Sequence, residues 1–211
     1  MQFVQKDNYR IEDLLAIMKM LRAPEGCPWD REQTHRSIRK DLLEEAYEAA
    51  EAIDADSDDM MLEEFGDVLL QVVFHSEIAH EEGRFDFDAV CDTVCKKLIV
   101  RHPHVFGDVS VADSEEVLTN WNKIKQETKG NETPGQQLRA VSKALPALMR
   151  GQKIAKHAVN NGLLAPTPAE ENAAQLITEH LWQAVRLAHA AKLDAEELFT
   201  KTLDEYVSAQ Q

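Results

Sequence analysis

Two acidic clusters hold the side chains best able to do chemistry in this chain. They are Glu44-Glu45-x-x-Glu48 and, a short distance further on, Glu64-x-x-Asp67. On a helix, carboxylates three positions apart are surface neighbours and can point at one spot. Carboxylate oxygens with no cysteine ligands nearby favour the hard cations Mg²⁺ and Mn²⁺. The spacing therefore indicates a metal site built by two helices.

The first cluster lies beside an apolar stripe. At 100° per residue, Glu45 borders this stripe and Glu48 lies about 60° away on its other side. Glu51 falls further round, and we expect it to be solvated. For Glu44, a solvated side chain and a functional one are both compatible with its position. The stripe consists of Ile38, Leu42, Ala49 and Ile53.

The second cluster lies on a helix that is apolar almost all round. Gln71 and His75 follow Glu64 and Asp67 on the same strip of this helix. Such a helix is expected to be buried. Ionised carboxylates are costly to bury without partners, and a neighbouring acidic helix adds repulsion. A divalent cation between the two helices would relieve both costs.

The composition favours a folded, helix-rich protein and limits the possible partners. The 211 residues are 44% hydrophobic, with only 8 glycines and 7 prolines. The formal net charge of −15 argues against nucleic acid or an anionic membrane as the main partner. An anionic substrate would need cations to mediate its binding.

Localisation is predicted to be cytoplasmic. The N-terminus lacks the apolar core and cleavage site of a signal peptide, and no stretch is long and apolar enough to span a membrane. The cysteines Cys27, Cys91 and Cys95 form no disulfide framework and are expected to be reduced structural thiols.

The apolar periodicity predicts helices throughout and no strands, so the fold class is all-α. "APEGCPWDREQ" and "RHPHVFGD" are predicted to be loops. The domains are expected at 1–128, with a linker at 129–138 and a helical region at 139–211. The expected helices are 10–22, 34–53, 58–82, 86–100, 113–125, 145–161, 169–191 and 195–208.

The two clusters and their surroundings resemble the all-α nucleoside triphosphate pyrophosphohydrolases, and most closely the MazG branch. The resemblance covers about residues 10–127 and continues less fully into "LPALMRGQKIAKHAVNNG". It rests on "GCPWDREQTHRSIRKDLLEEAYE", "EEFGDVLLQVVFHSEIAHEEGRFDF", "KKLIVRHPHVFGD" and "VLTNWNKIKQE". It implies a four-helix-bundle-like domain, a homodimer, and hydrolysis of NTPs to NMP and pyrophosphate.

The resemblance also implies roles for individual residues. Mg²⁺ would be held by Glu45, Glu48, Glu64 and Asp67. The catalytic side chains would be Glu44 and Glu45, with Glu44 supporting a second ion or orienting the attacking water. The substrate-binding side chains would be Trp29, Asp30, Lys97, Arg101, His102, Trp121 and Lys125. Structural alternatives stay open for Lys97 as a surface lysine, for Trp121 as a core aromatic and for His102 with His104 as loop histidines.

The second half departs from this family, whose longer members carry two such domains. The positions of its second Glu-x-x-Asp pair are taken here by Leu176 and Glu179, and no Glu-Glu-x-x-Glu helix precedes them. Without these ligands, a carboxylate site for Mg²⁺ is not expected there. We expect 139–211 to be a degenerate second region that serves packing or dimerisation.

Three other interpretations of the function stay open. Glu32-x-x-His35 and Glu77-x-x-His80 have the spacing of a di-iron helical bundle, but they are not expected to converge with the acidic clusters. A second reading is a non-catalytic, regulatory nucleotide-binding protein. A third is a sister hydrolase that acts on dUTP or phosphoribosyl-ATP.

Overall fold

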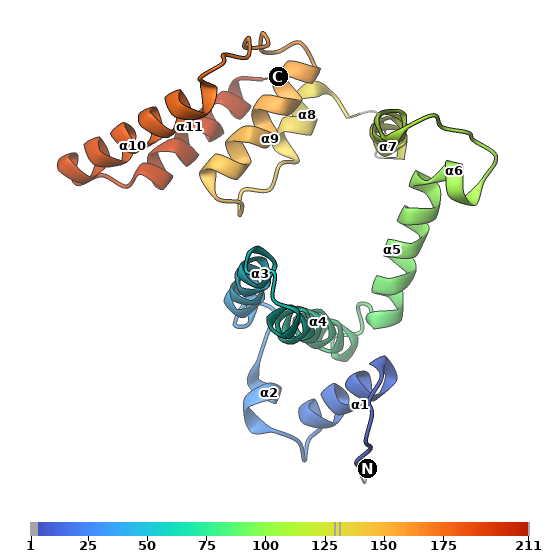
Figure 1. Ribbon diagram of the computed structural model, residues 1–211. Helices are drawn as coiled ribbons and strands as arrows, with labels where there is room; N and C mark the ends of the chain where they lie inside the picture. Colours follow the sequence, from blue (N-terminus) through green and yellow to red (C-terminus); the bar gives the residue numbers. More distant parts are fainter. Residues whose placement is uncertain (1–3, 129, 131, 211) are drawn as a thin grey trace. The chain divides into compact units, whose positions relative to one another are not determined.

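The computed structural model describes residues 4–128, 130 and 132–210, and every regular element in them is an α-helix (Figure 1). The all-α prediction is therefore confirmed. The chain divides into two compact units, Met1–Ser110 and Val111–Gln211, which we describe separately.

The first unit is organised around one antiparallel helix pair, α3 and α4, which lie side by side (Figure 1). A short turn joins them, and the Ser57 hydroxyl caps α4 by accepting a hydrogen bond from the Met60 amide (3.4 Å). The helices of this unit are α1 (Ile11–Arg22), α2 (Pro28–Glu32), α3 (Arg39–Asp54), α4 (Asp58–Glu81), α5 (Phe87–Arg101) and α6 (Pro103–Phe106).

The core of this unit lies where α1 packs against α4. Burying each large apolar side chain stabilises the fold by roughly 1.5–3 kcal/mol. These contacts fix the C-terminal half of α4 against its neighbours. The buried cluster consists of Met18, Ile38, Val73, Phe74 and Ile78.

Helix α4 is less enclosed than its apolar circumference predicts. Its C-terminal half is buried, but Leu62, Phe65 and Leu69 in its N-terminal half are exposed. Glu64 and Asp67 are therefore half-buried rather than fully desolvated. The prediction of a helix buried on all sides is wrong for the single chain, because α1 and α3 cover only part of its surface.

Helix α4 ends at a glycine, as its sequence predicts. Gly83 adopts φ +67°, a left-handed conformation that glycine reaches without steric cost. The amide of Gly83 donates to the carbonyl of His80, and the amide of Arg84 donates to that of Ala79 (both 2.9 Å). Just after this turn, the Arg84 side chain contacts His35.

In the second unit, α8, α9 and α11 share one core. Asp113 and Asp194 act as the predicted caps, because their carboxylates accept from the amides of Glu116 and Glu197 (both 2.9 Å). The helices are α7 (Ser114–Thr128), α8 (Pro134–Arg139), α9 (Ala147–Asn160), α10 (Ala173–Ala191) and α11 (Ala195–Ala209). The buried cluster consists of Leu138, Val141, Ile154, Ala158, Leu203 and Val207.

Three short helices appear where the sequence predicts loops or a linker. They are α2, α6 and α8, and each begins with a proline, whose fixed φ suits the first helical position. Helix α8 lies partly within the expected linker 129–138, and the boundary between the compact units falls after Ser110. The division into domains at 128 and 139 stays a prediction. None of the described helices is long and apolar enough to cross a bilayer.

Candidate metal centre

Three glutamates from α3 and α4 converge in the first unit. One carboxylate oxygen from each of Glu45, Glu48 and Glu64 lies within 4.8 Å of the other two. Glu45 and Glu64 are half-buried, and Glu48 is exposed. The packing of α3 on α4 produces this group, because Glu45 and Glu48 lie on the face that meets Glu64.

Mutual repulsion and partial burial act on these carboxylates. Desolvation raises the pKa of Glu45, and the charges of Asp67, Glu48 and Glu64 raise it further. Desolvation also raises the pKa of Glu64, followed by the charges of Glu48, Glu63 and Asp67. Asp67 therefore lies close enough to act on both, although the group within 4.8 Å does not include it.

The donor set fits a hard divalent cation. It consists of carboxylate oxygens, which Mg²⁺ prefers, on two helices that are held by one core. A cation among them would offset the repulsion that raises the two pKa values. Glu44 and Glu51 are exposed and stand outside the group. The metal-binding and catalytic roles stay predictions for all five residues, Glu44, Glu45, Glu48, Glu64 and Asp67.

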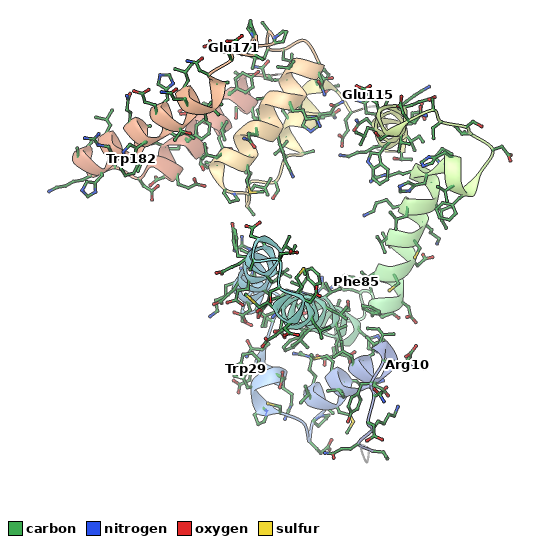
Figure 2. All side chains as sticks on the ribbon, in the orientation of Figure 1. Arg10, Trp29, Phe85, Glu115, Glu171 and Trp182 are labelled. Atoms are coloured by element: carbon green, nitrogen blue, oxygen red, sulfur yellow. The ribbon has the colours of Figure 1, made fainter. Side chains whose placement is uncertain are left out.

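Two of the predicted substrate-binding residues, Trp29 and Asp30, lie on the short helix α2, and α1 holds this helix in place. Trp29, labelled on α2 in Figure 2, is 57% exposed. Its ring meets the Phe74 ring edge-on, with the ring centroids 6.5 Å apart. The Arg22 guanidinium donates to the Asp30 carbonyl and forms two hydrogen bonds to Glu81 (2.9 and 2.7 Å). Arg22 is not among the predicted site residues, because its only local signal is its place just before Pro24 and Gly26.

Three further predicted substrate-binding residues, Lys97, Arg101 and His102, lie at the C-terminal end of α5. Lys97 is exposed, and Arg101 and His102 are half-buried. The His102 ring hydrogen-bonds through Nδ1 to the Leu98 carbonyl (2.7 Å) and lies 5.6 Å from the His104 ring. These side chains are on a different helix from the glutamate group, and their role in substrate binding stays a prediction.

Trp121 and Lys125 belong to the second unit. They lie one turn apart on α7, and both are half-buried. Lys125 lines a pocket of that unit. Their contact with the nucleotide stays a prediction.

The two Glu-x-x-His pairs do not form one centre. His35 stacks on His75 with ring centroids 5.0 Å apart, whereas Glu77 and His80 line a shallow surface beside Lys19. In the described residues, the glutamate group is the one set of three or more side chains placed to hold a metal. The arrangement gives no support to a di-iron bundle.

Comparison with known proteins identifies the family. The profile described as "MazG nucleotide pyrophosphohydrolase domain" matches residues 33–106, which include both acidic clusters. The chain is 44% identical over 191 residues to the "Nucleoside triphosphate pyrophosphohydrolase" of Escherichia coli strain K12, a match covering 89% of this chain and 73% of that protein.

Two further relatives support the same family assignment. The chain is 47% identical over 151 residues to the "Nucleoside triphosphate pyrophosphohydrolase/pyrophosphatase MazG" of Thermotoga maritima, covering 72% of this chain and 57% of that protein. It is 39% identical over 158 residues to the "Nucleoside triphosphate pyrophosphohydrolase" of Mycobacterium tuberculosis, covering 74% and 47%. With its two acidic helices inside the matched region, the chain belongs to the MazG nucleotide pyrophosphohydrolase family.

Proposed function

We propose that this protein hydrolyses nucleoside triphosphates between the α and β phosphates, giving nucleoside monophosphate and pyrophosphate in nucleotide-pool housekeeping. One observation carries the proposal: Glu45, Glu48 and Glu64 converge within 4.8 Å inside the region that matches the family profile. The relatives named as nucleoside triphosphate pyrophosphohydrolases support it.

In this proposal, Glu45, Glu48, Glu64 and Asp67 hold Mg²⁺, with Mn²⁺ as the alternative. When bound, the metal neutralises phosphate charge and lowers the pKa of a coordinated water. Glu44 is exposed beside Glu45, and its carboxylate orients the attacking water and takes up its proton. The cations Lys97 and Arg101 bind phosphate oxygens.

The remaining predicted contacts orient the nucleotide. His102 adds a phosphate contact, Trp29 and Trp121 offer aromatic faces to the base, and Asp30 and Lys125 offer polar contacts. Trp29 suits this role because it is 57% exposed although Arg22 holds its short helix in place. The three free cysteines are in keeping with the cytoplasmic location that we propose.

We further propose a homodimer formed through the first unit. The site is half-open in one chain, and the surface of α3, α4 and α5 exposes many large apolar side chains. A surface of this kind marks an interaction site. A second copy would cover these side chains, which include Leu43, Tyr47, Leu62, Phe65, Leu69, Val94, Leu98 and Val100.

Size-exclusion chromatography with light scattering tests the dimer. Leu62→Glu, at a position 79% exposed, should shift the protein to monomer, whereas Val4→Glu, 71% exposed near the N-terminus, should leave the dimer intact. A wild-type protein that is monomeric at the concentrations used for turnover would contradict the dimer.

The reaction is tested by ³¹P NMR of NTP and dNTP panels with Mg²⁺. The expected products are nucleoside monophosphate and pyrophosphate. Orthophosphate with nucleoside diphosphate would overturn the proposal. The same panel should include dUTP and phosphoribosyl-ATP, because a strong preference for either would identify a sister activity.

A non-catalytic, nucleotide-binding role is the second candidate. The observation that favours it is the second region, where Leu176 and Glu179 replace the expected acidic pair. Tight nucleotide binding with no product in the NMR panel would establish this role.

A further inference from the structure

The second unit contains a stretch whose charge is opposite to that of the whole chain. From Thr133 to Ala169 there is no Asp or Glu, although the formal net charge of the protein is −15. This stretch forms α8, α9 and their connections. It carries five permanent cations, Arg139, Lys143, Arg150, Lys153 and Lys156.

Three of these cations have partners within the unit. Arg150 is 1% exposed and donates to an Asp204 oxygen (2.7 Å), which also lies 3.4 Å from the Lys143 ammonium. Arg139 donates to the carbonyl of Gln210 (3.0 Å). These contacts fasten α8 and α9 to α11, so the three side chains are explained by packing.

The other two cations line a pocket. Lys153 and Lys156 are exposed on α9, and among the described side chains no hydrogen bond or ion pair involves either of them. The pocket has a volume of about 730 Å³, within the range of small-molecule sites. Lys125 of α7, which is proposed above as a substrate contact, lines it as well and is not counted in the second site. Glu132 is the one carboxylate among the described lining residues.

The pocket floor is held by a chain of amide hydrogen bonds. Asn161 donates one amide hydrogen to Gln137 Oε1 (3.0 Å) and the other to the His157 carbonyl (2.8 Å). Gln137 in turn donates to the Glu132 carbonyl (3.2 Å). The end of α9 is thereby fixed against α8 before any ligand arrives. Asn160, next to Asn161, also lines the pocket.

We propose that this pocket is a second, metal-independent binding site for a nucleoside phosphate or for pyrophosphate. Ammonium groups on a fixed wall bind phosphate oxygens through charge-assisted hydrogen bonds. Amide side chains beside them suit the polar edge of a base or a sugar hydroxyl. Nucleic acid is disfavoured as the ligand because the rest of the chain is strongly acidic. The site does not depend on the glutamate group or on turnover.

Isothermal titration of the full chain in EDTA tests the site, with inorganic pyrophosphate, triphosphate and ATP as the probes. Lys153→Ala and Lys156→Ala should each weaken binding roughly tenfold or more, because a hydrogen bond to a charged group contributes about 1.5–3 kcal/mol. Lys192→Ala and Lys201→Ala alter exposed lysines elsewhere in this unit and should leave affinity unchanged. Asp67→Asn should retain the metal-free binding.

Several results would overturn the proposal. The first is metal-free binding that is absent from the wild type or lost in Asp67→Asn. The second is unchanged affinity in the double variant that combines Lys153→Ala with Lys156→Ala, because the two lysines would then be solvated surface side chains only. The third is a double variant whose KM for NTP rises by the same factor as its EDTA dissociation constant, because the pocket would then belong to the substrate site.

Discussion

His35 Nδ1 lies 2.8 Å from His75 Nδ1, and the two rings are stacked within 3° of parallel. Arg84 is always a donor, so its contact makes His35 Nε2 an acceptor and leaves the proton of neutral His35 on Nδ1. His75 Nδ1 must then accept, which leaves its proton on Nε2. This Nε2 and Gln71 Oε1 are buried and have no protein partner in the described residues.

This pairing predicts a pH dependence of stability. Burial, followed by the neighbouring His35, lowers the pKa of His75 below its ordinary value of about 6.5. The unfolded chain then binds more protons than the folded one between the two pKa values. The stabilisation is complete above about pH 6.5 and decreases as the pH falls, by at most roughly 1.4 kcal/mol per pH unit for one proton.

Urea denaturation between pH 5 and 8 measures this effect. The difference in unfolding free energy between the wild type and His75→Gln should shrink as the pH falls. His180→Gln, at an exposed position on α10, should keep the wild-type pH dependence. A His75→Gln difference that is constant with pH would contradict the assignment.

The glutamate group predicts a loss of activity. Glu48→Gln and Asp67→Asn should each lower kcat/KM by at least about a hundredfold. Mutating a residue that only hydrogen-bonds to a metal ligand already lowers metal affinity or activity roughly 10–100-fold. Glu51→Gln, at an exposed position on α3, should retain near-normal turnover. Steady-state release of pyrophosphate measures all three. Near-normal rates in the first two variants would refute their assignment as metal ligands.

The same group predicts opposite pH behaviour in the metal-free protein. The raised pKa values of Glu45 and Glu64 mean that the folded state binds more protons than the unfolded state above the ordinary value of about 4.5. Their contribution to stability therefore falls as the pH rises through this window. Mg²⁺ at pH 7 should offset the loss and raise the Tm.

Differential scanning fluorimetry measures the Tm of the metal-free protein in EDTA and of the same protein after Mg²⁺ is added in excess over the EDTA. Because His75 acts in the opposite direction, the quantity to compare is the difference between the wild type and Glu64→Gln. Compared with the wild type, Glu64→Gln should be more stable at pH 7 than at pH 5. Its Tm should also rise less than that of the wild type when Mg²⁺ is added. Glu25→Gln, in an exposed loop, serves as the control. An equal response to Mg²⁺ in both proteins would argue against the site.

The buried Arg150 predicts a stability effect in the second unit. Its hydrogen bond lowers the pKa of Asp204, so this contribution is present above about pH 3.8 and is lost as the pH falls further. A buried guanidinium left without its acceptor costs about 1–3 kcal/mol. Asp204→Ala should therefore lower the Tm at pH 7, and Glu205→Ala, exposed on the same helix, should not. A Tm unchanged in both would exclude a stabilising pair.

Local features of the sequence determined the helices of this protein. Apolar periodicity, Ser57 and Asp194 as caps, and Gly83 as a stop act over a few residues, so they can be read from the chain. The spacing of Glu45 with Glu48 and of Glu64 with Asp67 likewise fixed the helix face that each pair shares. The short helices at Pro28, Pro103 and Pro134 were missed, because a proline both ends one helix and starts the next.

Only the tertiary structure decided which faces meet. Helical periodicity places a side chain around its own axis, but contacts between distant residues depend on how helices pack on a shared core. The packing of α3 on α4 brought Glu64 to Glu45 and Glu48 and left Phe65 exposed. The same packing joined His35 to His75 across forty positions of the chain, a pairing that no local pattern predicts.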